Sequence, residues 1–289
     1  MKNNIIKIGL GVVLLGTMAS CDLDTTPTTS LDAANAFKST TYAEDVIRGT
    51  WNNIFNDAWS YASVGLGSIM LNDDFMGSDA VRSKSYGFAN CYNLTSGYSR
   101  DQYGKLFWDF AYDAINNCNG VIADIDNASG TEADKSRIKG QAYGTRGYMY
   151  LLLASHFSFA IDKDPNAVCV PIYTEPTSMD VALTGNPAAS VKEVYDQALA
   201  DLKQAVDLIP SNYSHGTEAI DQYKIDHNVA LGLMARASLY ARNWQDAYDY
   251  ADESLKINSY LMTEEEYKGG FNDCSNKEWI WAYSSTIDD

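Results

Sequence analysis

Aromatic rings and short polar side chains are concentrated between residues 56 and 101. A ring can cover the apolar C–H face of a pyranose while carboxylate and amide groups bind its hydroxyls, so this mixture suits a sugar. The alternative is that the rings only pack this segment onto its neighbours, as most large aromatics do. The segment is long for a loop and too aromatic for disorder, which predicts an irregular functional loop. Its candidate ligand-binding residues are Trp59, Tyr61, Asp73, Asp74, Tyr86, Asn90 and Tyr92.

Catalytic motifs are missing from the sequence. Asp73 and Asp74 are adjacent, and in extended backbone their side chains would diverge, whereas a glycosidase needs two facing carboxyls about 5–10 Å apart. The histidines, His156, His215 and His227, lack the His-Glu-x-x-His spacing, and neither a Gly-x-Ser-x-Gly elbow nor a Walker loop is present. We expect no catalytic residue, no cofactor and no enzyme activity. A glycoside hydrolase with two distant carboxylates brought together stays an alternative, because the chain has 38 acidic residues.

One segment begins like a calcium-binding loop, at Asp162-Lys-Asp164-Pro-Asn166. Ala167 replaces the glycine that such a loop needs, and Tyr173 stands where the bidentate glutamate should be. We interpret the segment as a turn and expect no metal site, with calcium as the alternative.

Composition limits the partners. The chain has 289 residues, 46% of them hydrophobic, so it can bury a large core and is not disordered. Its 38 acidic and 21 basic residues give a formal charge of −17, which repels phosphate backbones. We therefore expect no nucleic-acid partner.

Residues 1–20 are typical of an export signal. Lys2 and Lys7 precede an apolar stretch from Ile8 to Ala19, which would rise only about 18 Å as a helix and cannot cross the roughly 30 Å of a bilayer core. Cys21 follows small residues, as in a bacterial lipobox, where it would become the lipidated first residue of the mature protein. An ordinary cleavage site beside a chance cysteine is the alternative. Lipid chains on Cys21 would hold the protein on a membrane without spanning it.

The other cysteines are Cys91, Cys118, Cys169 and Cys274. None is in a C-x-x-C spacing, so zinc ribbons and thioredoxin-like chemistry have no support. In an exported protein they could form disulfides, and buried thiols are an equal alternative.

Helices dominate after a polar tether at residues 21–39. Capping-box spacing at Thr41-Tyr-Ala-Glu44 and at Ser190-Val-Lys-Glu193 predicts two helix starts. The clearest apolar stripe runs from Gln102 to Ile125. Another helix spans Glu132–Phe159, and its apolar second half implies burial between neighbours.

Two consecutive helices, His227–Arg242 and Trp244–Asn258, have almost no linker and must fold back as a hairpin. Small residues are expected where the two helices cross, which resembles the tetratricopeptide pattern. These are Ala235, Ala247 and Ala251, with Leu231, Tyr240, Trp244 and Leu255 expected to pack beside them. The helices from Glu132 and Ser190 could pair similarly through Gly140 and Gly147. We expect an all-α fold with tetratricopeptide-like hairpins in one domain over residues 40–289.

Several segments occur in a specific order along the chain. They are Cys21-Asp-Leu-Asp-Thr-Thr-Pro, Gly49-Thr-Trp-Asn-Asn, Leu71-Asn-Asp-Asp, Ile115-Asn-Asn-Cys-Asn-Gly-Val-Ile, Lys139-Gly-Gln-Ala-Tyr-Gly-Thr-Arg-Gly-Tyr-Met-Tyr, Val170-Pro-Ile-Tyr-Thr-Glu-Pro-Thr, Asp201-Leu-Lys-Gln-Ala, Ala235-Arg-Ala-Ser-Leu-Tyr and Glu278-Trp-Ile-Trp-Ala. This ordered set resembles the SusD/RagB family over essentially the whole mature chain.

The resemblance implies a helical lipoprotein, lipid-anchored on the surface of the outer membrane, that binds nutrients, most often glycans, and caps a TonB-dependent SusC-like transporter. We expect this chain to capture an oligosaccharide without catalysis and deliver it to that transporter. The alternative is a helical interaction scaffold that docks on the transporter, with the cargo, peptide included, bound elsewhere.

The sequence departs from the family in two ways. Family members run to roughly twice this mature length, so we expect the chain to be the N-terminal part of a SusD-like protein. Its last segment, Trp279-Ile-Trp-Ala-Tyr, alternates like a strand. An Asp directly after Cys21 favours inner-membrane retention in enteric bacteria, but we expect the outer-membrane location of the family.

Overall fold

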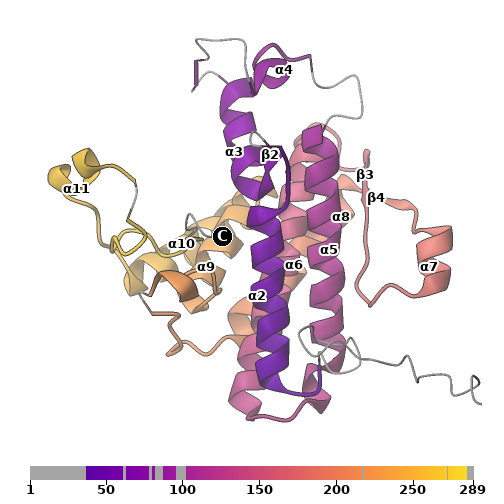
Figure 1. The fold of residues 1–289 in the computed structure, drawn as a ribbon, viewed down its shortest axis with the longest axis vertical. Coiled ribbons are helices and arrows are strands. Elements are labelled where there is room, and N and C mark those ends of the chain that lie inside the picture. Colours follow the sequence, from indigo (N-terminus) through magenta and orange to yellow (C-terminus); the bar gives the residue numbers. More distant parts are fainter. Residues whose placement is uncertain are drawn as a thin grey trace, which may run out of the picture.

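The computed structural model describes residues 37–60, 63–77, 80–81, 87–95, 102–216, 218–271 and 273–284. The predicted all-α fold is confirmed, because helices form nearly all of the regular structure and the strands make only small antiparallel pairs (Figure 1).

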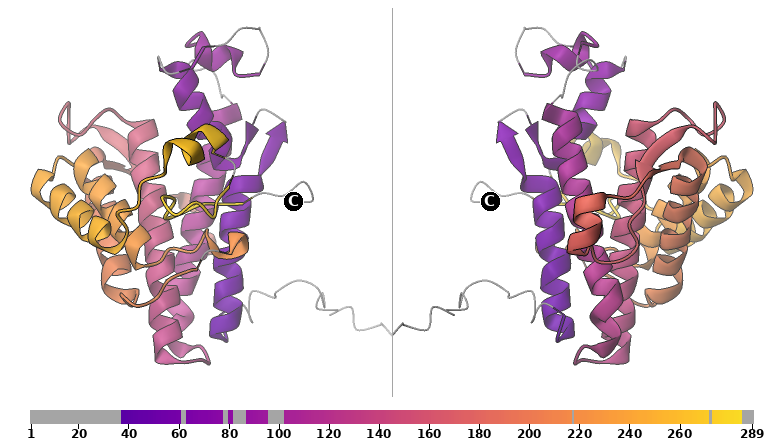
Figure 2. Two further views of the ribbon diagram at one scale, coloured as in Figure 1. Left: turned by 90° about the vertical axis from the view of Figure 1, so that its left-hand side faces the viewer. Right: turned by 90° about the vertical axis from the view of Figure 1, so that its right-hand side faces the viewer.

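The long helices are α2 (Thr40–Asn56), α5 (Gln102–Asp124), α6 (Glu132–Phe157), α8 (Val191–Leu208), α9 (His227–Tyr240) and α10 (Trp244–Ile257). The short ones are α3 (Gly65–Met76), α4 (Ala89–Tyr92), α7 (Met179–Thr184) and α11 (Glu264–Gly269), with 3-10 turns η2 (Ile125–Asn127) and η3 (Ala219–Asp221). Strand β1 (Ala58–Ser60) pairs with β2 (Ser63–Val64), and β3 (Val168–Pro171) pairs with β4 (Ala188–Ser190). Helices α9 to α11 lie on one side of the bundle, and β3, β4 and α7 lie on the other (Figures 1 and 2).

Helices α6 and α8 form the centre of the bundle and the predicted second hairpin. Their backbones approach closely at glycines of α6: a Cβ at Gly140 would lie 2.6 Å from the Ile209 side chain, and one at Gly147 would lie 2.9 Å from Leu202. Any larger residue there would push the helices apart. The later part of α6 is buried, as its apolar sequence predicts, with Tyr150 among its largest enclosed side chains.

A buried ion pair joins these two helices. Arg146 donates to the Asp201 carboxylate from Nε at 2.8 Å and from Nη2 at 2.6 Å, and the two side chains are only 4% and 3% exposed. Its Nη1 donates to Oδ1 of Asn119, on α5, at 2.7 Å and to the Thr174 carbonyl at 3.1 Å. Asn119 in turn donates from Nδ2 to the Glu175 carbonyl at 2.9 Å. One guanidinium therefore connects α5, α6, α8 and the segment after β3.

The helix starts agree with the sequence in one case and differ in the other. The predicted capping box of Ser190 and Glu193 is present at α8. At α2, however, the cap is Ser39, whose hydroxyl accepts from the Tyr42 N–H at 3.2 Å, and the predicted box at Thr41 is wrong. Ser39 is extended and forms an isolated bridge with Ser129, so the helix begins at the next residue.

The prediction of one irregular loop over residues 56–101 is wrong. The segment contains α3, a helix of 12 residues, because Leu66 and Ile69 lie about one turn apart and are both buried in the core. Glycines and adjacent acids obscured this helical pattern. Gly65 has a φ of +48°, and a Cβ there would lie 2.3 Å from the Phe55 carbonyl oxygen, so the turn into α3 requires glycine.

Helices α9 and α10 form the predicted hairpin, but its outer helix is less buried than expected. Leu231 is buried, whereas Tyr240, Trp244 and Leu255 are exposed, with Trp244 exposed by 59%. No residue of α10 is buried, because this helix packs mainly on α9. The large side chains of Trp244, Tyr248 and Leu255 are therefore mostly exposed, whereas Tyr250 is half-buried against the core.

The last described residues form no strand, contrary to the predicted strand-like run. Trp281 contacts Trp51 edge-on, with ring centroids 5.0 Å apart, and donates from Nε1 to the Tyr223 carbonyl at 2.8 Å. Tyr283 stacks on Phe55 at 4.3 Å. The alternating residues Trp281 and Tyr283 therefore pack their rings on α2 and do not pair in a sheet.

No disulfide joins Cys91, Cys118, Cys169 and Cys274, all of which are described. Complete burial raises the pKa of the Cys118 thiol to about 12. Because the thiolate is the reactive form, this thiol is a packing group and not a nucleophile.

We predict that Arg146→Met or Asp201→Asn lowers the free energy of unfolding by about 3–5 kcal/mol, because either change leaves the partner's charge buried and uncompensated. Urea unfolding followed by circular dichroism measures the loss. The control is Lys203→Met, which breaks the exposed Lys203–Asp207 pair of α8 and should cost less than about 1 kcal/mol. Equal small losses in all three variants would contradict the role of the buried pair.

Candidate functional site

A groove of about 1090 Å³ lies between α3, α5 and the end of α6. Rings form much of its wall. They are Tyr103, Phe107, Trp108, Phe157 and Phe159. Trp108 and Phe159 are 36% and 65% exposed, so part of each ring can contact a ligand, although Lys163 Nζ lies over one face of Phe159, 3.3 Å from the ring centroid. Phe157 packs edge-on against Trp108, with centroids 5.3 Å apart, and fixes the indole from behind.

A buried amide also lines this groove. Asn72, on α3, is only 7% exposed, and its Oδ1 has no hydrogen-bond partner among the described residues. Buried polar atoms in proteins are nearly always hydrogen-bonded, and leaving one unsatisfied costs about 1–3 kcal/mol. The oxygen itself is enclosed in this structure, so a ligand hydroxyl can donate to it only when the amide turns toward the groove.

A histidine connects the two sides of the groove. His156 Nε2 lies 2.9 Å from Asp73 Oδ2, which ties the end of α6 to α3, and its Nδ1 lies 2.8 Å from the Leu152 carbonyl. Burial acts to lower the pKa of His156, but the hydrogen bond and charge of Asp73 outweigh it, so the pKa lies above its ordinary value. Asp109 is likewise paired, with Lys105 on the next turn of α5. Both carboxylates of the groove are thus held in ion pairs.

Among the sequence-predicted ligand residues whose side chains the structure describes, one lines this groove. That residue is Asp73. Asp74 follows it on α3 and is exposed outside the lining, and Asn90 and Tyr92 are exposed on α4. The side chain of Trp59, and all of Tyr61, Tyr86 and Cys21, lie outside the described residues.

Helix α4 is attached to the groove through a series of rings. Phe88, just before α4, stacks on Phe75 of α3 at 5.2 Å and on Tyr103 of α5 at 5.6 Å. Tyr103 itself lines the groove. The polar residues of α4 are therefore anchored beside the groove wall but do not form it.

Sequence reasoning missed Asn72, Trp108, His156 and Phe159. For Trp108 a signal existed, because this large ring stands outside the apolar stripe that α5 turns toward the core. For His156 and Asn72 the sequence held no comparable signal, since each becomes distinctive only when α3 and α6 meet.

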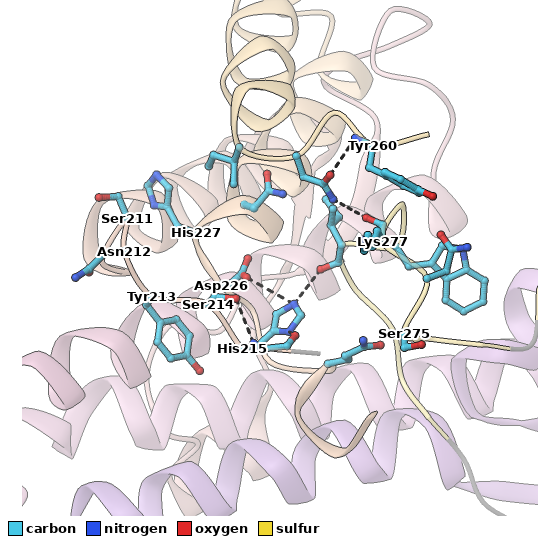
Figure 3. A pocket seen from close by; sticks show the side chains of 18 residues that line it. Ser211, Asn212, Tyr213, Ser214, His215, Asp226, His227, Tyr260, Ser275 and Lys277 are labelled. Atoms are coloured by element: carbon cyan, nitrogen blue, oxygen red, sulfur yellow. Dashed lines mark hydrogen bonds and ion pairs between the residues drawn. The ribbon is translucent and has the colours of Figure 1, made fainter. Parts of the chain in front are cut away.

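A second cavity, of about 420 Å³, is polar and lies between residues 211–216, the start of α9 and residues 275–280 (Figure 3). Several of its polar groups bond to the chain itself. His215 Nε2 lies 3.0 Å from the Ile280 carbonyl and 3.6 Å from Asp226 Oδ2, and Asn258 donates to the Lys277 carbonyl at 2.8 Å. We interpret this cavity as the attachment of the C-terminal segment to α9.

The calcium-like segment is a turn, as interpreted. Asp162 pairs with Arg242 at 3.1 Å, and Asp164 Oδ1 accepts from the Asn166 N–H at 2.9 Å. Within the described ranges, no group of three or more His, Cys, Asp or Glu residues is arranged to hold a metal ion.

Comparison with known proteins connects this geometry to a family. The profile of a SusD-like family, described as starch-binding and associating with the outer membrane, matches residues 23–239. No curated protein matches the chain.

Solved structures agree with this match. A SusD-like carbohydrate-binding protein from Bacteroides vulgatus is 48% identical, with a TM-score of 0.83 over 87% of this chain and 52% of its own. Surface glycan-binding protein A from Bacteroides fluxus shares the fold, with 21% identity and a TM-score of 0.64 over 83% of this chain and 49% of its own. The chain thus spans about half the length of these proteins.

We predict that Asp73→Asn lowers the pKa of His156, because the variant removes the charge that stabilises the imidazolium while its burial remains. Since the folded-state pKa is raised, the pair stabilises the fold fully below the unfolded-state pKa of about 6.5 and fades as pH rises through the folded-state pKa. An NMR titration of the His156 ring measures the shift. Asp74→Asn, one residue along, is the control and should leave it unchanged; an unaltered titration in Asp73→Asn would refute the coupling.

Proposed function

The chain belongs to the SusD-like family, and on that basis we propose that it is a cell-surface, glycan-binding lipoprotein. It captures an oligosaccharide without catalysis and delivers it to a SusC-like TonB-dependent transporter in the outer membrane. The carbohydrate-binding relative from Bacteroides vulgatus, at 48% identity, supports the ligand class.

The unsatisfied Oδ1 of Asn72 is the observation that carries the proposal. The Asn72 side chain lines a groove in which two exposed rings, Trp108 and Phe159, offer apolar surface. A pyranose presents both a C–H face and hydroxyl donors, so it can cover a ring and, once the Asn72 amide turns toward the groove, donate a hydrogen bond to it. Trp59 and Tyr86, which the sequence predicts to bind the ligand, stay part of the proposal as predictions.

The charges of the groove support binding without catalysis. Asp73 is held by His156 and Asp109 by Lys105. Both carboxylates are therefore engaged by neighbouring side chains, and their remaining lone pairs can accept hydrogen bonds from sugar hydroxyls. A glycosidase needs one carboxyl placed to protonate the leaving group and a second one facing it.

Attachment to the membrane and contact with the transporter are further parts of the proposal. No helix among the described residues is long and apolar enough to span a bilayer. We propose that lipid on Cys21 anchors the protein and that the exposed face of the α9–α10 hairpin docks on the transporter. That face carries Trp244 and Tyr248 beside a shallow cavity of about 520 Å³ lined in part by Ala247. This surface also supports the second candidate, a scaffold whose cargo is bound elsewhere.

We predict that Asn72→Leu weakens oligosaccharide binding about tenfold, the worth of one hydrogen bond to a buried amide. The same variant should leave the free energy of unfolding unchanged or higher, because it removes an unsatisfied polar atom. A glycan array with the full chain identifies the ligand, and calorimetry measures affinity. Trp59→Ala and Tyr86→Ala should also weaken binding if the loop contributes.

The matched control is Asn127→Leu, an exposed amide in η2 after the far end of α5. It should bind as the wild type does. Unchanged affinity in Asn72→Leu would remove the groove from the account, and failure of every glycan to bind would favour the scaffold.

We predict that different single substitutions abolish membrane attachment and transporter contact. Cys21→Ser should release the protein from the membrane fraction, because the acylated thiol is lost. Trp244→Ala should stay in that fraction but fail to co-purify with the transporter, since large rings at interface centres often contribute 2 kcal/mol or more, roughly thirtyfold in affinity. Tyr267→Ala, an exposed ring of α11, is the control. Membrane retention of Cys21→Ser would contradict the lipid anchor, and normal co-purification of Trp244→Ala would contradict docking by the hairpin.

A further inference from the structure

We propose that the sugar-binding surface continues past Trp108 into an adjoining cavity, so that the ligand is an uncharged chain of several sugar units lying along the exposed face of α5. This inference rests on the proposed function and extends it to the length and charge of the ligand.

The adjoining cavity has a volume of about 360 Å³ and lies between α5 and the segment from the end of β3 to Gly185, just after α7. Trp108 lines both this cavity and the groove. Phe157, on the groove side, packs edge-on against the indole, and Tyr112, in the adjoining cavity, lies with its centroid 4.7 Å from it. The indole is therefore a ridge shared by two ligand-sized hollows, and a ligand that covers it can reach into both.

The same two elements border both hollows. Helix α5 supplies Lys105 and Asp109 to the groove, and Asp113 and Asn116 to the adjoining cavity. Strand β3 begins at the groove with Val168 and ends at the adjoining cavity with Pro171. Figures 1 and 2 show the segment from β3 to α7 lying beside α5. The hollows are thus consecutive stretches of one channel.

The exposed face of α5 has the length and chemistry for a sugar chain. From Lys105 to Asn116 the helix rises about 16 Å, which is longer than a disaccharide requires. Trp108 and Tyr112 supply rings one turn apart, and Asp113 follows at the next exposed position. Asn116 accepts from the Thr177 N–H at 2.9 Å through Oδ1, which fixes the amide and leaves its Nδ2 as a donor.

The charges on this face favour a neutral ligand. The pKa of Asp113 is raised, mainly by partial burial and to a smaller extent by the negative charges of Asp109 and Asp57. Hydroxyl donors would stabilise that carboxylate, whereas a sugar acid would add another negative charge to the same face. The channel therefore suits uncharged sugar units.

Calorimetry with homologous oligosaccharides, from disaccharide to hexasaccharide, tests the channel on the full chain. The probes are the neutral malto-, xylo- and cello-series, with oligogalacturonides as the acidic comparison. Wild-type affinity should rise at least tenfold along the neutral series that binds. Asp113→Ala should weaken the hexasaccharide about tenfold and leave the disaccharide unchanged, because only the longer ligand crosses Trp108. Asp124→Ala, at the other end of α5, is the matched control and should match the wild type.

The outcomes separate this inference from the proposed function. If disaccharide and hexasaccharide bind equally and Asn72→Leu still weakens both, the groove stands and the channel is wrong. If the gain with length persists in Asp113→Ala, the longer ligand does not enter the adjoining cavity, and the channel is wrong. Tighter binding of oligogalacturonides would overturn the neutral assignment. No binding by any probe would overturn both proposals.

Discussion

A guanidinium shielded from water constrains the whole arrangement of this protein. Arg146 meets Asp201 of α8, Asn119 of α5 and the carbonyl of Thr174, so helices from three parts of the sequence must converge on one charge. Removing either partner would leave a buried charge or dipole unsatisfied, which costs several kcal/mol. In the observed placement of these elements the guanidinium is paired with all three. The groove and the adjoining cavity both lie along α5 and the segment around β3, two of the elements that this charge fixes.

This network also gives a physical meaning to the sequence resemblance. Four of the segments that resemble the family each supply one member: Asn119, Arg146, Thr174 and Asp201. Separately the segments are unremarkable, and none would identify a fold. Together they place a cation, an anion, an amide and a carbonyl where all four can meet.

The sequence predicted a helix well where a single apolar stripe faces the core, as in α5. It also predicted the hairpin of α6 and α8, where glycines of α6 let the two helices approach closely. It failed where local signals conflict: glycines and paired acids hid α3, and strand-like alternation at Trp281 and Tyr283 proved to be packing on a helix. The site was harder still. Asp73 was identified for its type, but its partner His156 lies 83 residues away, and no local pattern joins them.

The central claim is that rings and a buried, unsatisfied amide bind a sugar chain beside α5. The most direct measurement is a crystal structure of the full chain with a bound neutral hexasaccharide. The account predicts a sugar ring over the face of Trp108 and a hydroxyl within hydrogen-bonding distance of Asn72 Oδ1. A hexasaccharide bound instead in the polar cavity around His215, or on the outer face of α10, would contradict it.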